Sequence, residues 1–279
     1  MNVKRHDIDV IRPNRAGYGR TMQTMLSAGA DKIWVEDSGG SGPPLLLLHE
    51  GVGDARMWDP VWEQLTASFR AIRYDVRGFG RSPEPSENFT LLGDAQSVLD
   101  QLGVESAHVA GCSMGGMTAL ELTLAQPDRV RTLVLLCPGI SGYPYPEYPG
   151  LEAQFEALAA AGDQDGLVRL GLEQWAAAGP DPLITELMRS AQRAWAGEEQ
   201  FEQAGEPVYD RLGELRVPTV LMVGDKDEPG LIASNEAAAA RIPGCELIRM
   251  PGTDHYPTVR VPALVLDTIL RHCADHRAD

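Results

Sequence analysis

A regular alternation of short apolar runs with longer amphipathic segments is the feature that most constrains how this chain folds. The run PLLLLH at 44–49 is almost entirely apolar, as expected of a strand that is buried on both faces of a sheet. Further candidate strands lie at 70–75, 107–111, 131–137, 219–224 and 246–250. Segments with helical periodicity lie between or after them, at 56–68, 90–102, 115–126, 231–241 and 261–273. This alternation predicts an α/β fold in which helices cover a mostly parallel sheet.

Two earlier segments complete the predicted sheet. TMQTML at 21–26 and KIWVED at 32–37 are joined by the short connection SAGAD, which predicts an antiparallel pair. Together with the six later strands, they predict a twisted, mostly parallel sheet of eight strands.

Residues 140–212 interrupt this alternation, because they contain no strong strand pattern. They begin with GISGYPYPEYPG and continue as helical segments such as LEAQFEALAAAG and LVRLGLEQWAAAG, before a strand pattern returns in VPTVLMVG. This predicts a helical cap at 140–212 inserted between two late strands, with the core formed by 21–139 and 213–279. A separate domain is the weaker alternative, since both flanks resemble strands of one sheet.

The first 20 residues form a basic extension, with five Lys and Arg side chains against two Asp. Such a segment either docks on the body or on a partner subunit of a homo-oligomer, or it frays. The sequence leaves these alternatives open.

Composition excludes several classes of function. Asp and Glu number 40 against 24 Lys and Arg, a formal net charge of -16, which argues against nucleic-acid and membrane partners. The N-terminus has no apolar signal region, and the longest apolar run is too short to cross a bilayer. The four cysteines show neither C-x-x-C nor zinc spacing. We therefore expect a cytoplasmic protein without a metal or another cofactor.

The stretch HVAGCSMGGMTAL at 108–120 contains a G-x-S-x-G match centred on Ser113. A candidate strand runs directly into it and a helical pattern runs directly out, which is the setting of a nucleophile elbow. Glycines at 111, 115 and 116 allow the close backbone approach that such a turn needs. The alternative is a serine that caps the N-terminus of the helix.

A serine nucleophile needs a base and an acid that orients the base, and in this setting they follow the serine in the order acid, histidine. His255 lies in MPGTDHYP, directly after the strand at 246–250, and is the predicted base. His272 and His276 lie in the last helix and its polar tail, where exposure to solvent is expected. A loop histidine bonded to backbone is the alternative role for His255.

The predicted acid is Asp227, three residues beyond Gly224 at the end of the strand TVLMVG. Asp225 lies nearer the strand end and is better suited to bonding the turn. The loop after the strand at 131–137 is the other common location for the acid, and it has no carboxylate before Glu147.

Acyl transfer also needs backbone N–H groups that stabilise the oxyanion. One is expected from Met114, which follows the serine, and the second from Gly51, in the loop after the strand of LLLLHEGVGDARMW.

These segments together resemble the α/β-hydrolase family, from about residue 32 to residue 274. The matching pieces are LLLLHEGVGDARMWDP, YDVRGFGRS, HVAGCSMGGMTAL, VPTVLMVGDKD and PGTDHYP. The resemblance implies Ser113 as nucleophile, His255 as base, Asp227 as its orienting acid, and a cap that closes over the pocket. SMGGM is most similar to lactonase and carboxylesterase members, including the 3-oxoadipate enol-lactonase type. A serine nucleophile disfavours dehalogenase and epoxide-hydrolase chemistry, which uses aspartate there.

One position departs from the family pattern, since many members have His-Gly where this chain has His49-Glu50. The Glu50 side chain either faces solvent or biases the pocket against anionic substrates, and the sequence does not decide its orientation. We expect His49 to brace the loop by hydrogen bonds. In DVRGFGRS, Arg77 or Arg81 is expected to pair locally in a structural turn.

The sequence therefore predicts a cofactor-free serine hydrolase that cleaves a carboxylic ester or lactone of a small molecule. Candidates for the apolar walls of its pocket are Trp58, Trp175, Trp195 and the tyrosines at 143–148. Two alternatives remain: carbon–carbon bond hydrolysis or peroxide-dependent chemistry with the same triad, and a hydrolase-like receptor that binds a small molecule. No P-loop or dinucleotide fingerprint competes with these.

Overall fold

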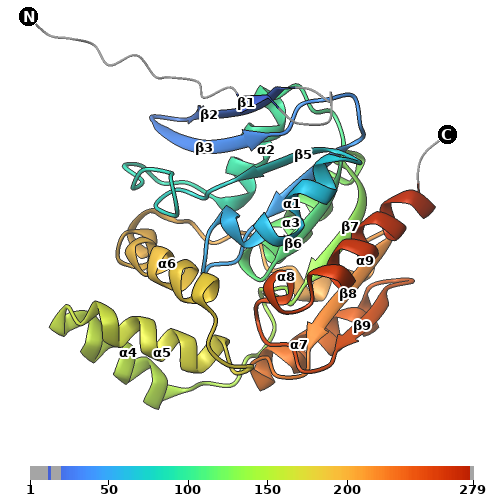
Figure 1. The fold of residues 1–279 in the computed structure, drawn as a ribbon. Coiled ribbons are helices and arrows are strands. Elements are labelled where there is room, and N and C mark those ends of the chain that lie inside the picture. The colour runs from blue at the N-terminus through green and yellow to red at the C-terminus, as the bar shows by residue number, and fades with distance from the viewer. Residues whose placement is uncertain (1–11, 14–19, 277–279) are drawn as a thin grey trace, which may run out of the picture.

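The computed structural model describes residues 12–13 and 20–276. The described part forms an open sheet with the strand order β1-β2-β3-β5-β4-β6-β7-β8-β9 (Figure 1). The strands are β1 (Arg12–Pro13), β2 (Arg20–Ala28), β3 (Asp31–Asp37), β4 (Pro44–Leu48), β5 (Arg70–Tyr74), β6 (Ala107–Cys112), β7 (Val130–Leu136), β8 (Thr219–Gly224) and β9 (Glu246–Met250).

The pairing confirms the predicted sheet of eight strands, β2 to β9. β2 pairs with β3 and β3 with β5 in antiparallel fashion. The remaining neighbours, in the order β5-β4-β6-β7-β8-β9, are all parallel. β1 adds two residues of the predicted N-terminal extension to the edge, antiparallel to β2. Most of that extension lies outside the described residues, so the choice between docking and fraying stays open.

Helices follow the strands as the alternation predicts. They are α1 (Asp59–Thr66), α2 (Leu91–Gln101), α3 (Met114–Ala125), α7 (Pro229–Arg241), α8 (Pro257–Arg260) and α9 (Pro262–Asp275), with the 3₁₀ helices η1 (Ala55–Trp58), η2 (Pro127–Arg129) and η3 (Tyr209–Glu214). Across the described residues, none of the helices has the length and apolar character needed to span a membrane.

The apolar run of β4 supplies both cores, one on each face of the sheet. Leu45 and Leu47 belong to one buried cluster, and Leu46 and Leu48 belong to the other. Side chains alternate along a strand, so a run that is apolar at every position must be covered on both faces. Helices α1 and α9 pack over the first cluster, and α2 and α3 pack over the second.

Three further helices lie between β7 and β8: α4 (Pro149–Ala161), α5 (Gln164–Trp175) and α6 (Pro182–Phe201). Figure 1 shows them grouped to one side of the sheet, apart from the helices that flank it. We call α4 to α6 the cap helices. Their position agrees with the predicted helical insertion between late strands, while its domain bounds at 140–212 stay a prediction.

The turn after β5 is held by ion pairs, as expected for DVRGFGRS. Arg81 pairs with Asp75 within the turn at 2.8 Å, whereas Arg77 reaches Asp31 at 2.9 Å and Asp94 at 2.7 Å. Asp75 also accepts a hydrogen bond from the backbone of Ala55 at 2.9 Å. The turn is therefore fixed to η1, which directly follows the predicted oxyanion loop.

Candidate active site

Ser113 lies at the sharp turn between β6 and α3. Its backbone has φ 50° and ψ −113°, a region that residues other than glycine rarely adopt. A Cβ atom on Gly111 would lie 2.3 Å from the carbonyl oxygen of Gly115, so this approach excludes a larger residue. Although Ser113 occupies the N-cap position of α3, its side chain makes no capping hydrogen bond. The geometry is that of an elbow rather than of a helix cap.

His255 and Asp227 are hydrogen-bonded to each other in the interior. Nδ1 of His255 lies 2.9 Å and 3.1 Å from the two carboxylate oxygens of Asp227. An ionised carboxylate can only accept, so Nδ1 carries a proton, and in the neutral imidazole the basic lone pair is on Nε2. Burial opposes ionisation of Asp227, but the interactions with His255, with the Glu228 backbone and with Cys137 outweigh it and hold the pKa of Asp227 below its ordinary value.

Cys137 is a neighbour of this pair that sequence reasoning missed. It follows β7, is fully buried and has φ 44°. Its sulfur, Asp227 and His255 offer atoms within 4.8 Å of one another, and the described residues contain no other such group that could hold a metal ion. The sequence pattern places Cys137 at the end of the predicted strand 131–137, and nothing in it marks this thiol as a partner of Asp227.

Asp225 and the two histidines at the end of α9 have structural roles. Oδ1 of Asp225 accepts a hydrogen bond of 2.6 Å from the backbone of Gly252, so this side chain braces the turn as expected. His272 lies 3.1 Å from the carbonyl oxygen of Pro218, and His276 bonds to the backbone of His272. Neither histidine joins Asp227.

The loop after β4, residues 49–54, is braced by His49 as expected. The backbone N–H of Val76 donates to Nε2 of His49 at 3.0 Å, so Nδ1 carries the proton and donates to the carbonyl oxygen of Glu50 at 2.7 Å. Burial lowers the pKa of His49 and keeps the ring neutral. Because the peptide unit is planar and trans, fixing this carbonyl also fixes the direction of the next N–H, that of Gly51.

The two predicted oxyanion donors lie close together. A Cβ atom on Gly51 would lie 3.6 Å from the sulfur of Met114. The backbone N–H of Gly115 donates to the carbonyl oxygen of His49 at 3.0 Å, which joins the loop to the elbow. Met114 is the first residue of α3, where helix N–H groups and the helix dipole favour negative charge.

Two further contacts tie the loop of His255 to the other parts of the site. The thiol of Cys112, next to Ser113, lies 4.0 Å from the carbonyl oxygen of His255. The hydroxyl of Tyr256 donates to the carbonyl oxygen of Val52 at 3.1 Å. The elbow, the oxyanion loop and the histidine loop therefore hold one another. Sequence analysis did not single out Tyr256, whose role depends on a partner 204 positions away.

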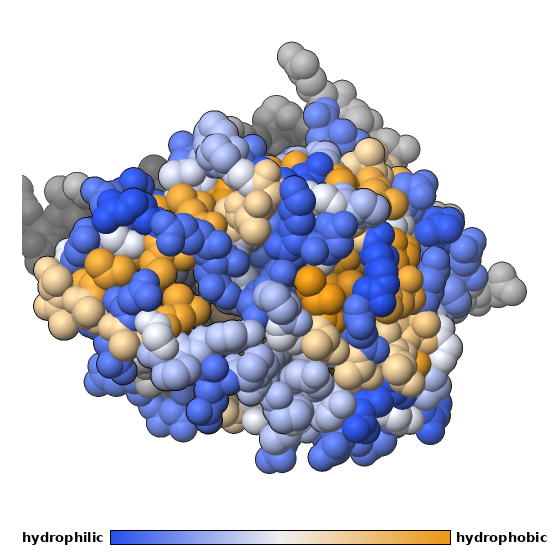
Figure 2. Space-filling model, turned by 90° about the horizontal axis from the view of Figure 1, so that it is seen from below, coloured by the Kyte–Doolittle hydropathy of each residue, from blue (hydrophilic) through white to orange (hydrophobic). Residues whose placement is uncertain are grey.

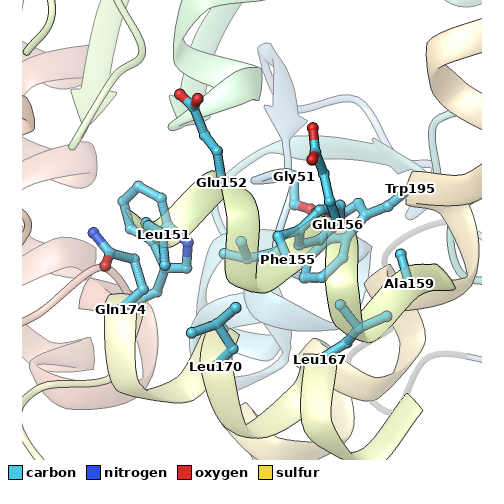
Figure 3. Close-up of a pocket in the computed structure, with 13 residues that line it drawn as sticks. Gly51, Leu151, Glu152, Phe155, Glu156, Ala159, Leu167, Leu170, Gln174 and Trp195 are labelled. Carbon is cyan, nitrogen blue, oxygen red and sulfur yellow. Dashed lines mark hydrogen bonds between the residues drawn. The ribbon is translucent and has the colours of Figure 1, made fainter. Parts of the chain in front are cut away.

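A cavity of about 800 Å³ lies between the oxyanion loop and the cap helices (Figure 3). It is lined by Gly51, Val52, Leu151, Glu152, Phe155, Glu156, Ala159, Leu167, Leu170, Gly171, Gln174, Trp175 and Trp195. The ring of Trp175 lies 4.5 Å from that of His255, which places this cavity beside the candidate base. A cavity of this size and composition suits a small, largely apolar molecule.

The aromatic candidates for the pocket wall divide into two groups. Trp175 and Trp195 line the cavity as expected. Trp58 does not, because it is fully buried in the core beneath the sheet. The tyrosines at 143–148 are also absent from the lining, and the hydroxyl of Tyr148 instead donates to Glu228.

The charge of the cavity is negative. Glu152 and Glu156 are its two ionisable lining residues, one helical turn apart on α4, and among the described residues that line it none is basic. Figure 3 shows both carboxylates on the same side of α4. From the side on which α4 and α5 lie, Figure 2 shows hydrophobic surface between hydrophilic side chains.

Glu50 lies in the interior, with 0% of its surface exposed. Of the two orientations that the sequence left open, a side chain facing solvent is therefore wrong. Glu50 is also absent from the residues that line the cavity.

The fold, the elbow and the histidine–aspartate pair define the class of this protein. Residues 45–268 match the profile of the Alpha/beta hydrolase family, and the chain belongs to that family.

Among curated proteins, the chain is 28% identical to 3-oxoadipate enol-lactonase 1 of Acinetobacter baylyi, in a match that covers 82% of this chain and 88% of that protein. It is 37% identical to zearalenone hydrolase of Bionectria ochroleuca, but there the match covers 40% of this chain and 45% of the relative. The chain thus spans less than half the length of some curated relatives that it matches.

Among solved structures, the carboxylesterase CesB of Bacillus subtilis has the same fold, with a TM-score of 0.78 at 22% identity. That match covers 91% of this chain and 92% of the carboxylesterase.

Proposed function

We propose that this protein is a serine hydrolase that cleaves a carboxylic ester or lactone of a small molecule through an acyl-enzyme, with no cofactor. The observation that carries this proposal is the buried hydrogen bond between His255 and Asp227, at 2.9 Å, in a loop that contacts the elbow of Ser113. Nucleophile, base and orienting acid are the parts that acyl transfer requires.

In the acylation step, the hydroxyl oxygen of Ser113 attacks the substrate carbonyl carbon while Nε2 of His255 takes the hydroxyl proton. Asp227 keeps the imidazole in the required tautomer and stabilises the imidazolium that forms. The negative charge that develops on the carbonyl oxygen is stabilised by the N–H groups of Gly51 and Met114. Collapse of this intermediate breaks the ester bond, and His255 gives its proton to the departing alkoxide.

In the deacylation step, His255 removes a proton from a water molecule as the water oxygen attacks the acyl-serine carbonyl carbon. The second tetrahedral intermediate then expels the serine oxygen, which recovers its proton from His255. The products are a carboxylic acid and an alcohol, or a hydroxy acid from a lactone.

The cavity lining supports an uncharged, mainly apolar substrate. Phe155, Leu167, Trp175 and Trp195 offer apolar surface, and burying such surface contributes roughly 25 cal/mol per Å². The carboxylates of the lining repel an anion, and no basic residue among the described lining residues offsets them. The names of the lactonase and carboxylesterase relatives support the same bond types.

A fluorophosphonate probe followed by mass spectrometry of the labelled peptide tests the nucleophile, and hydrolysis of p-nitrophenyl butyrate tests turnover. We expect labelling at Ser113, and loss of both labelling and turnover in Ser113→Ala with unchanged thermal stability. Ser106→Ala is the matched control, because this serine lies just before the opposite end of β6 and bonds to Arg131. Turnover by Ser113→Ala near the wild-type rate would reject the proposal.

The same experiment separates the alternatives. A fast burst of nitrophenolate followed by steady turnover supports an esterase or lactonase. Stoichiometric acylation without turnover supports a receptor, and turnover that requires a diketone or peroxide supports the remaining alternatives. The cytoplasmic location expected from the sequence stays a prediction, and a homo-oligomer stays one of the alternatives that the sequence leaves open.

A further inference from the structure

Glu50 is a buried acid in the predicted oxyanion loop of the candidate site. It lies between His49, which braces the oxyanion loop, and Gly51, a proposed oxyanion donor. It is 0% exposed, and neither carboxyl oxygen has a hydrogen-bond partner of good geometry among the described residues. A buried polar group without a partner destabilises a fold. An acid kept here therefore requires an explanation.

The surroundings of Glu50 favour its uncharged form. Its carboxyl group packs against Gly53, where a Cβ atom would lie 2.2 Å from Oε1, and the same position faces Leu187 of α6. The groups that couple to it electrostatically are the carboxyl group of Asp54 in the same loop, the thiol of Cys112 on β6 and the phenol of Tyr256 before α8. None of these is a cation.

Arg56 does not supply the missing positive charge. Its guanidinium donates two hydrogen bonds to Asp54, at 2.9 Å and 2.7 Å. This pairing keeps Asp54 ionised despite burial and lowers the pKa of Asp54 well below its ordinary value. Glu50 therefore faces a negative charge from its own loop, and among the described groups that couple to it electrostatically none is positive.

We propose that Glu50, as an uncharged carboxylic acid, is a positioning residue for the oxyanion loop, and that its ionisation inactivates the enzyme at alkaline pH. This inference rests on the proposed function of the site. The uncharged acid fills the space enclosed by Gly53 and Leu187 and keeps the loop closed over it. A carboxylate there must reach water or a cation, and the loop that carries Gly51 has to move for it to do so.

The charge itself acts in the same direction. The reaction develops negative charge on an oxygen beside the N–H of Gly51, one residue from Glu50. A second negative charge nearby, in an interior of low dielectric constant, opposes that development. Burial raises the pKa of Glu50 to about 8; its own backbone N–H opposes this shift, and Asp54 adds to it. The site is thus active below this pKa and loses activity above it.

The test is the pH dependence of kcat and KM for p-nitrophenyl butyrate, corrected for spontaneous hydrolysis, between about pH 6 and about pH 10. In the wild type we expect kcat to fall about tenfold per pH unit above the pKa of Glu50, with KM little changed. Glu50→Gln has the same shape without the ionisable group, and its kcat should stay level across this range. Glu50→Gly also lacks the ionisable group and serves if the amide is not tolerated.

Glu121→Gln is the matched control. Glu121 is also a buried acid, on α3, and burial together with Glu202 raises its pKa to about 7. It lies two helical turns beyond the elbow, so its replacement should leave the alkaline loss of activity as in the wild type. If kcat still falls at alkaline pH in both Glu50 variants, the role of Glu50 is overturned but the proposed function is not. Absence of wild-type turnover at every pH would overturn the proposed function, and this inference with it.

Discussion

The indole N–H of Trp195, on cap helix α6, donates a hydrogen bond of 2.9 Å to the carbonyl oxygen of Gly51. The bond joins positions 144 residues apart and connects the cap directly to the predicted oxyanion loop. With His49 on the preceding carbonyl, it fixes two consecutive peptide groups of that loop. The cap therefore does more than cover the cavity, because it also fixes the peptide group that follows the one bearing the N–H of Gly51.

Replacing Trp195 with phenylalanine tests this connection. In the wild type the ring centroids of Trp195 and Phe155 lie 5.7 Å apart. Trp195→Phe keeps an aromatic ring beside Phe155 but removes the donor. A hydrogen bond of this kind contributes about 1 kcal/mol, so we expect kcat to fall roughly three- to tenfold, with KM for p-nitrophenyl butyrate little changed. Trp62→Phe is the control, since Trp62 stacks on Arg73 away from the cavity. Equal kinetics of the two variants would show that the bond has no catalytic role.

The two aspartates after β8 should differ sharply in their effect on catalysis. Asp227→Asn removes the charge that orients His255 and stabilises its protonated form, and an equivalent change in a catalytic triad lowers kcat about 10⁴-fold. Asp225→Asn keeps an acceptor for the backbone of Gly252 and should retain kcat within a factor of about two. Steady-state kinetics of both variants, with circular dichroism to verify folding, test the assignment. A larger loss of kcat in Asp225→Asn would transfer the acid role to that residue.

The carboxylates of the cavity should select against anionic substrates. The test compares two substrates, p-nitrophenyl valerate and the p-nitrophenyl monoester of glutaric acid. The second has a carboxylate where the first has its terminal methyl group. Replacing both Glu152 and Glu156 with glutamine should raise kcat/KM for the anionic ester about three- to tenfold at low salt, because two repulsive charges are removed. The neutral ester should be unaffected.

Glu173→Gln provides the control for this comparison, because Glu173 is an exposed acid of α5 outside the cavity lining. Added salt should reduce the difference between the variants, since exposed charges are screened. Wild-type preference for the anionic ester would contradict the inferred charge selectivity.

The stability of the fold should also depend on Glu50. Its pKa is about 8 in the folded protein, above the ordinary 4.5, so the folded state holds a proton that the unfolded state has released. The stabilisation by the uncharged acid is therefore complete below pH 4.5 and is lost as pH rises toward 8. Relative to Glu50→Gln, the wild-type free energy of unfolding should decrease by roughly 1.4 kcal/mol per pH unit in this window. Urea unfolding at several pH values measures it, and parallel curves for the two proteins would argue against an uncharged Glu50.

The strand pattern shows how far the sequence alone could predict the fold. The leucines of β4 are apolar at successive positions, and only a strand covered on both faces accommodates them. The elbow was predictable for a similar reason, since closely spaced glycines around Ser113 satisfy a local steric requirement at Gly111. The assignment of α4 and α5 as helices followed from composition and periodicity in the same way.

Other features depend on partners that no local pattern specifies. Trp58 was a candidate for the pocket wall, yet it packs in the core, because an aromatic residue near a loop satisfies either environment. The thiol of Cys137 lies beside Asp227 only because the ends of β7 and β8 are adjacent in the sheet.

The sequence by itself determined which segments form strands and helices, and which serine occupies the turn between them, because periodicity and small residues act over a few neighbouring positions. Only the tertiary structure decided that Glu50 lies inside, without a hydrogen-bond partner among the described residues, and that Trp195 holds Gly51. Those outcomes depend on contacts between residues more than a hundred positions apart. The chemistry of a side chain permits several partners there, and close packing decides which of them it meets.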